Sequence, residues 1–311
     1  MALDAQAGSF SQANAQILAQ AAAVAYLPPA TCEKWAARSG FTGPFDFLDH
    51  QDTQGFVAES DDAVLVAFRG TQPNHSMDWF VDAGAVHRPW AHDAGTVHTG
   101  FYNALLAVWG VKLGHTEVLP QRLLSRGRKT VWMTGHSLGG ALAELCAAQA
   151  AFVSDIPVQG VYTFGQPRVG SKKFAEAVDA SLGSRIFRFI NHRDIVPRVP
   201  LFSGGYCHYG NTTFFDADGK STEEMSAVET LANAFKSGTA VFNLGIVRQA
   251  ADAIKLGIGR VLGAETPIEE AEQAFRETAR SLLRLGVEKI DDHDMKKHYL
   301  VRLGTSLPPD L

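Results

Sequence analysis

Cysteine is scarce in this sequence, and its cysteines lie too far apart to act together. There are three, Cys32, Cys146 and Cys207, separated by long stretches of chain. A disulfide framework needs an even number of cysteines, and a structural metal site needs cysteines or histidines a few residues apart. The sequence therefore predicts neither, and it predicts that Cys146, inside an apolar stretch, is a buried thiol.

Basic residues are missing from the N-terminal part, and no apolar run is long enough to span a membrane. No Lys or Arg precedes Lys34, and Asp, Asn and Gln interrupt residues 1–27. A secretory signal has a basic start and an unbroken apolar region, and a transmembrane helix needs about 20 apolar residues. We expect no transmembrane segment and favour a cytoplasmic or peripheral protein. An extracellular location would fit if the chain is a mature form.

A strong excess of charge is also missing. The net charge is −5 over 311 residues, which gives no electrostatic reason to expect nucleic acid as a partner. With 46% apolar residues, the chain is long enough to bury a large core, and we expect a single domain over 1–311. The oligomeric state stays open.

What the sequence does have is a stretch at 130–140 that predicts a nucleophilic serine. An apolar run ends in Gly-His-Ser-Leu-Gly and an Ala/Leu-rich segment follows at once, which is the order strand, sharp turn, helix. Gly135 and Gly139 supply the small flanking residues that such a strained turn requires, and the turn exposes Ser137 at a helix N-terminus. The alternative, an N-capping serine, does not explain small residues on both sides.

Predicted strands and helices alternate along the chain. Strands are expected at 63–68, 130–136, 161–164 and 185–190, with helical segments between the last three. This order predicts an α/β fold with a mostly parallel, doubly wound sheet and helices on both faces. Residues 41–50 are expected to be loop, and 205–220 a hairpin.

Two further residues at predicted strand ends are candidates for the same site. Thr71 follows Gly70 just past a strand, where its backbone N–H and that of Leu138 would form an oxyanion hole, although Thr71 could also be an ordinary turn residue. Asp194 follows the strand at 185–190 and comes after the serine in the chain, the order expected for an acid that orients a histidine. Asp216 and Asp218 are weaker candidates.

These blocks together resemble the fungal-type triacylglycerol lipases (lipase class 3), within the α/β-hydrolase superfamily. The matching blocks are the serine turn, Phe68–Thr71, Val97–Phe101, Tyr162–Gly170 and Asp194–Pro200. The resemblance covers about half of the chain. It implies Ser137 as nucleophile, Asp194 as acid and Thr71 as oxyanion donor.

The resemblance places the histidine base near the C-terminus, commonly after an aspartate. Asp292-His293-Asp294-Met295 fits this form, so His293 is the preferred base and His298, directly before Tyr299, is the reserve. The earlier residues His98, His136 and His208 are expected to be structural.

Two segments each fit two structural interpretations. Residues 73–96 hold a short apolar cluster, Met77, Trp79, Phe80 and Val81, which corresponds to the family's lid position but could be a helix packed permanently beside the sheet. Residues 222–290 predict a helical insertion before the base. Its middle helix is amphipathic and either meets a lipid interface or packs on the domain or a second subunit.

The expected activity is hydrolysis of carboxylic esters, most of all those of acylglycerols. A lipid–water interface fits as the location of the substrate, and the reaction is expected to need no metal and no organic cofactor. The alternatives are a soluble carboxylesterase or feruloyl esterase, a phospholipase A1, and more remotely a lipid-binding protein without catalysis.

Overall fold

The computed structural model describes most of the chain outside two long segments. The described residues are 2–70, 87–110, 112–113, 117–125, 127–192, 194, 196–200, 205–216, 218–223 and 293–311. Thr71, residues 73–86 of the expected lid region and residues 224–290 of the expected insertion lie outside them, and so do Met77, Trp79, Phe80 and Val81.

A central eight-stranded sheet organises the fold. In order across the sheet, its strands are β1 (Phe45–His50), β2 (Thr53–Glu59), β3 (Ala63–Phe68), β8 (Thr130–His136), β9 (Gly160–Phe164), β11 (Ile186–Asn191), β13 (Asn211–Phe215) and β14 (Ser221–Glu223). The five strands from β3 to β13 are parallel, whereas the pairs β1–β2, β2–β3 and β13–β14 are antiparallel. This confirms the mostly parallel sheet predicted from the sequence.

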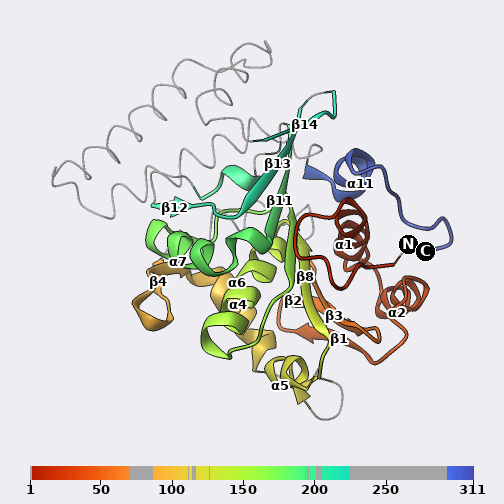
Figure 1. Cartoon of the computed structure of the whole chain (residues 1–311), viewed down its shortest axis with the longest axis horizontal. Helices are drawn as coiled ribbons and strands as arrows, with labels where there is room; N and C mark the ends of the chain where they lie inside the picture. Colours follow the sequence, from red (N-terminus) through yellow and green to blue (C-terminus); the bar gives the residue numbers. More distant parts are fainter. Residues whose placement is uncertain are drawn as a thin grey trace.

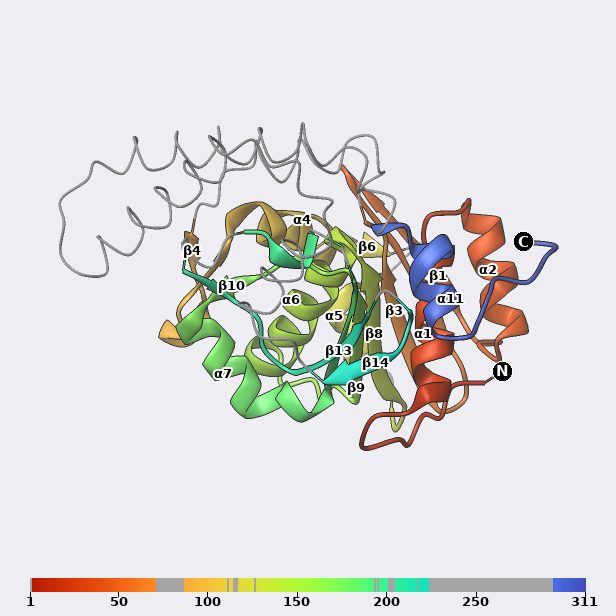
Figure 2. The same cartoon turned by 90° about the horizontal axis from the view of Figure 1, so that it is seen from above.

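Helices cover both faces of the sheet, as the sequence predicts (Figures 1 and 2). One face carries α1 (Gln12–Val24), α2 (Pro29–Arg38) and the short α11 (Leu300–Arg302). The other carries α4 (Thr99–Trp109), α5 (Leu119–Leu124), α6 (Leu138–Val153) and α7 (Lys172–Leu182). The helix α2 begins at Pro29, a residue that favours the first turn, and it was not predicted.

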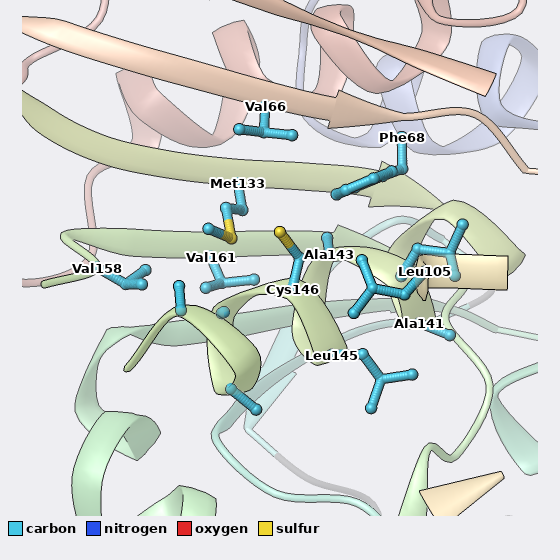
Figure 3. Packing of buried hydrophobic residues seen from close by; sticks show 14 of the residues in the cluster. Val66, Phe68, Leu105, Met133, Ala141, Ala143, Leu145, Cys146, Val158 and Val161 are labelled. Carbon is cyan, nitrogen blue, oxygen red and sulfur yellow. The ribbon is translucent and has the colours of Figure 1, made fainter. Parts of the chain in front are cut away.

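The alternation of side chains along the strands divides the core into two layers. In β3, Val64 and Val66 face α6, while Ala63 and Leu65 face α1 and α2. Because successive strand residues point to opposite faces and both faces are covered, every residue of β3 is buried. Figure 3 shows Met133 of β8 and Cys146 of α6 among the side chains of the first layer. Cys146 is thus a buried free thiol, as expected.

A small second sheet corrects two expectations. It orders β12 (Tyr206–Cys207), β10 (Gly170–Ser171), β5 (Thr96–His98) and β4 (His87–Pro89). Residues 87–96 of the expected lid region therefore include β4, the 3₁₀ turn Ala91–Asp93 and the first residue of β5. The expected hairpin at 205–220 is shifted along the chain, because β13 and β14 form an antiparallel hairpin over residues 211–223 while β12 joins the small sheet. Residues 222–223, the start of the expected insertion, belong to β14.

The expectation of a loop at 41–50 is also wrong. Residues 45–50 form β1, paired along its whole length with β2. Remaining short elements are β6 (Lys112–Leu113) paired with β7 (Glu117–Val118), and the 3₁₀ turns Gly183–Arg185 and Val196–Arg198. None of the helices in the described ranges is long and apolar enough to cross a membrane.

The C-terminal segment brings residue 293 back to the carboxyl ends of the parallel strands. It contains a π-helical turn, Met295–Tyr299, continues into α11 and ends as a tail along α1 and α2. The Gln16 and Gln20 side chains donate to the Leu303 carbonyl and the Thr305 hydroxyl at 2.8 and 2.7 Å. At the chain end, Asp310 pairs with Arg38 at 2.5 Å. These contacts fix the segment that follows His293.

Candidate active site

The turn between β8 and α6 holds Ser137 in a strained backbone conformation. Its φ of 58° and ψ of −131° lie outside the regions that non-glycine residues usually adopt. A Cβ on Gly135 would lie 2.2 Å from the Gly139 carbonyl carbon, and one on Gly139 would lie 2.3 Å from the Phe68 carbonyl oxygen. Both positions therefore require glycine, which is the physical reason for the small residues around the serine.

The N-terminus of α6 points its free backbone groups toward this serine. Leu138 is the first residue of α6, and the first four N–H groups of a helix have no acceptor within the helix. The loop after β3 lies against the same point, since a Cβ on Gly70 would be 3.1 Å from the Ser137 Cβ. The residue after Gly70 is Thr71, the other expected oxyanion donor, which is outside the described residues.

His293 and Asp194 form a buried hydrogen-bonded pair. The distance from His293 Nδ1 to Asp194 Oδ2 is 2.7 Å, and Asp194 is fully buried while His293 is 7% exposed. Asp194 stands just past β11 and also accepts bonds from the Val196 N–H at 2.9 Å and the Tyr299 hydroxyl at 2.5 Å. A carboxylate with three donors is held in one orientation.

Gly165, at the end of β9, makes room for this pair. Its φ is +59°, and a Cβ there would lie 2.7 Å from Asp194 Oδ2 and 2.8 Å from His293 Cε1. Glycine is required on both counts, because the backbone is left-handed and the space is taken by the two side chains.

The reactive atoms of the serine and the histidine are both shielded from solvent. In the described part of the chain, neither Ser137 Oγ nor His293 Nε2 has a hydrogen-bond partner. The ring of His136, the residue before the serine, lies against the His293 ring with centroids 4.4 Å apart and the ring planes tilted by 32°. Of the sequence-predicted residues, Asp194 and His293 thus come together beside the His136–Ser137 turn, and no hydrogen bond joins Ser137 Oγ to His293 Nε2. His298 lies five residues beyond His293, half-buried on the π-helical turn.

The other histidines and aspartates weighed in the sequence have local structural contacts. His98 Nδ1 accepts the Phe101 N–H at the start of α4, and burial is the main cause that lowers the pKa of His98 to about 4. His208 Nε2 lies 2.6 Å from the Pro197 carbonyl oxygen. Asp216 Oδ1 accepts the N–H groups of residues 218 and 220 within its own turn.

Sequence reasoning missed three residues around the site. Tyr299 binds Asp194, as described above, and the Tyr26 hydroxyl lies 2.9 Å from His136 Nδ1. Glu144, two turns along α6 from the serine, is 1% exposed, and burial raises its pKa to about 7 against the opposing charge of Arg188. A glutamate inside the otherwise apolar stretch 138–153 is a sequence signal for such a group. The two tyrosines give no comparable signal.

Within the described ranges, no group of three His, Cys, Asp or Glu side chains could hold a metal ion. Parallel strands, a strained serine between strand and helix, and a histidine–aspartate pair past later strands define the α/β-hydrolase class.

Comparison with known proteins shows which family the central part of the chain is similar to. Residues 65–204 match the family described as Lipase (class 3). The chain is 29% identical over 201 residues to secreted mono- and diacylglycerol lipase A of Penicillium cyclopium, which covers 62% of each chain. The chain thus spans less than two thirds of that relative.

Solved structures of fungal lipases share the fold. Lipase II from Rhizopus niveus superposes with a TM-score of 0.54 at 27% identity, covering 67% of this chain and 83% of that lipase. A fungal lipase–inhibitor complex, described as a model for interfacial activation in lipases, gives a TM-score of 0.55 at 25% identity, with 68% and 83% covered.

Proposed function

We propose that this protein hydrolyses carboxylic esters of acylglycerols through an acyl-enzyme on Ser137. The observation that carries the proposal is the buried 2.7 Å bond between His293 Nδ1 and Asp194 Oδ2, combined with the strained Ser137 at the N-terminus of α6. Neither feature alone defines a reaction, but together they supply a nucleophile, a base and a group that orients the base.

The first step is proton transfer from Ser137 to His293. Asp194 is an acceptor facing Nδ1, so the proton of the neutral His293 ring is on Nδ1 and Nε2 is free to act as base. As Ser137 Oγ attacks the ester carbonyl, Nε2 takes its proton and Asp194 stabilises the imidazolium that results. His293 then protonates the departing alcohol, and water releases the acid by the same steps.

The developing oxyanion would be bound at the start of α6. The backbone N–H of Leu138 and that of Thr71 are the proposed donors, and the helix dipole adds a partial positive charge at the same point. Removal of one such donor typically costs about 100- to 1,000-fold in kcat. The reaction as proposed uses no metal and no organic cofactor.

The substrate class rests on similarity. The Penicillium cyclopium relative is named as a mono- and diacylglycerol lipase, and the fungal lipase–inhibitor complex is described in terms of interfacial activation. As part of the proposal, this protein also acts on acylglycerols, and it meets them at a lipid–water interface.

The test is the initial hydrolysis rate against tributyrin concentration, carried across its solubility limit, with Ser137→Ala as the blank. A rise in rate when droplets form is expected for an interfacially activated lipase. Saturation below that limit would replace this with a soluble esterase using the same residues. No rate above the blank would refute acylglycerol hydrolysis.

A further inference from the structure

His136, which precedes the nucleophile, is enclosed by polar partners. It is 5% exposed, and Nε2 lies 2.7 Å from the backbone carbonyl oxygen of His293. Nδ1 lies 2.9 Å from the Tyr26 hydroxyl. Its ring also lies against the ring of His293, with centroids 4.4 Å apart and the planes tilted. One side chain therefore contacts both the backbone and the ring of the proposed base.

These contacts assign the protons. A carbonyl oxygen only accepts, so the hydrogen of His136 must be on Nε2, which donates to His293. In the neutral ring Nδ1 is then an acceptor, and the Tyr26 hydroxyl must donate to it. Tyr26 therefore supports the tautomer that binds the His293 carbonyl.

The surroundings also keep His136 uncharged. Burial lowers its pKa well below the usual value, and the neighbouring charge of His293 lowers it further. The ionisable groups that face this cluster are Tyr26 with Arg69 over its ring, His293 and Tyr299, and more distantly Asp294, which acts on Tyr26. Two imidazolium rings with centroids 4.4 Å apart would repel each other, so a neutral His136 allows His293 to become charged during the reaction.

We propose that His136 is a positioning residue for the base, and that Tyr26 acts through it. His136 fixes the backbone of His293 with one hydrogen bond, and Tyr26 holds His136 in the tautomer that can make this bond. Asp194 fixes the ring of His293, so the base is held at two points. This inference rests on the proposed function, since it assigns a role toward His293 as the catalytic base.

The test compares kcat and KM of four variants with those of the wild type on a soluble short-chain ester. The concentration of active sites in each protein is determined by titration with a fluorophosphonate, and kcat is calculated per active site. His136→Leu removes the donor, and we expect kcat to fall about 10- to 100-fold with KM changed less than about threefold, because the base is misplaced. His136→Gln keeps an N–H donor without a charge and should recover most of the loss. Tyr26→Phe should lower kcat about 3- to 10-fold, as expected for one hydrogen bond.

Tyr102→Phe is the matched control. Tyr102 is half-buried like Tyr26, its hydroxyl donates to the Gln149 side chain at 3.3 Å, and Arg88 stacks on its ring as Arg69 does on Tyr26. It lies on α4, away from the His293–Asp194 pair, and its loss should leave kcat unchanged.

A double variant tests whether Tyr26 acts through His136. Adding Tyr26→Phe to His136→Leu should cause no further loss of kcat. If the two substitutions lower kcat independently, so that their factors multiply, Tyr26 does not act through His136. Equal kcat values in Tyr26→Phe and Tyr102→Phe would also overturn this role of Tyr26. If His136→Gln falls as far as His136→Leu, the donor role is refuted. Should His136→Leu fail to fold, the two tyrosine variants and His136→Gln decide the question.

A measurement without activity separates this inference from the proposed function. The ¹⁵N spectra are recorded on the Ser137→Ala protein, and the ring signals of His136 are assigned as those that disappear in His136→Gln. These signals should show the Nε2–H tautomer of His136. The Nδ1 signal should shift when Tyr26→Phe is added. The Nδ1–H tautomer would overturn the inference even if the esters are hydrolysed. If the wild-type protein hydrolyses no ester while the tautomer is found, the proposed function fails and the proton assignment remains.

Discussion

Tyr299→Phe removes one hydroxyl that serves two buried partners. Tyr299 is fully buried. Its hydroxyl donates to Asp194 Oδ2 at 2.5 Å and accepts the Asn191 N–H at 3.1 Å. The change takes the Tyr299 acceptor away from the Asn191 N–H, at a cost of about 1–3 kcal/mol, and takes one donor from the Asp194 carboxylate, at a cost of about 1.5–3 kcal/mol. We expect the free energy of unfolding to fall by about 2.5–6 kcal/mol in total.

Tyr162→Phe separates the two contributions. Tyr162 is also fully buried, and its hydroxyl accepts the Ser11 N–H at 3.1 Å. This control therefore loses a bond to a backbone N–H but leaves Asp194 untouched. The difference between the two variants should be about 2 kcal/mol, which is the contribution of the bond to the carboxylate.

Kinetics give a second comparison of the same pair. Among the described residues, Val196 and His293 remain as donors to Asp194 in Tyr299→Phe, so the histidine is less firmly oriented and kcat should fall about 10-fold. In Tyr162→Phe, kcat per titrated site should stay within about twofold of wild type. The assays are urea unfolding and ester hydrolysis. If both variants lose the same stability and kcat is unchanged in Tyr299→Phe, the bond from Tyr299 neither stabilises the fold through Asp194 nor helps Asp194 to orient His293.

Two further predictions concern groups near the site. Burial raises the pKa of folded Glu144 to about 7 from its usual value of 4.5, so the folded state retains a proton that the unfolded chain loses. This group therefore makes the free energy of unfolding fall as pH rises from about 4.5 to 7, by about 3 kcal/mol at most. Glu144→Gln should flatten that part of a stability–pH curve measured by urea unfolding, and an unchanged slope would contradict the shift. Gly165→Ala puts a Cβ 2.7 Å from Asp194 Oδ2 in a left-handed backbone, and kcat should fall about 100-fold. The control is Gly40→Ala, where the backbone is also left-handed but the space around it is open. This control should lose stability without losing activity. Equal kcat in the two alanine variants, measured on the soluble ester, would refute the steric argument.

The turn at Ser137 could be predicted because its cause is local. Small residues at 135 and 139 are needed by contacts within the strand–turn–helix unit and with the neighbouring strand β3, and apolar runs flank the turn directly. Asp194 was predictable for a related reason, since its position just past a strand end follows from the alternation of strands and helices.

The parts that the sequence did not predict depend on contacts between distant segments. The strand β1 contains Asp46 and Asp49 and is stabilised by its pairing with β2, so its own composition indicates a loop. The strand β12 joins β10, far away in the chain, instead of its neighbour β13. Tyr26 lies 110 residues from His136, and nothing within either segment indicates the partner.

The most direct test is the rate of covalent labelling by a fluorophosphonate, followed by intact mass and peptide mapping. We expect one adduct per chain, on Ser137, and no adduct in Ser137→Ala. In His293→Ala and Asp194→Asn labelling should be slower by about 100-fold or more, because the serine loses its base or the base loses its orientation, while His298→Ala should be labelled at the wild-type rate. Labelling of Ser137 at the wild-type rate in His293→Ala, or an adduct at another residue, would contradict a nucleophilic serine activated by His293 and Asp194.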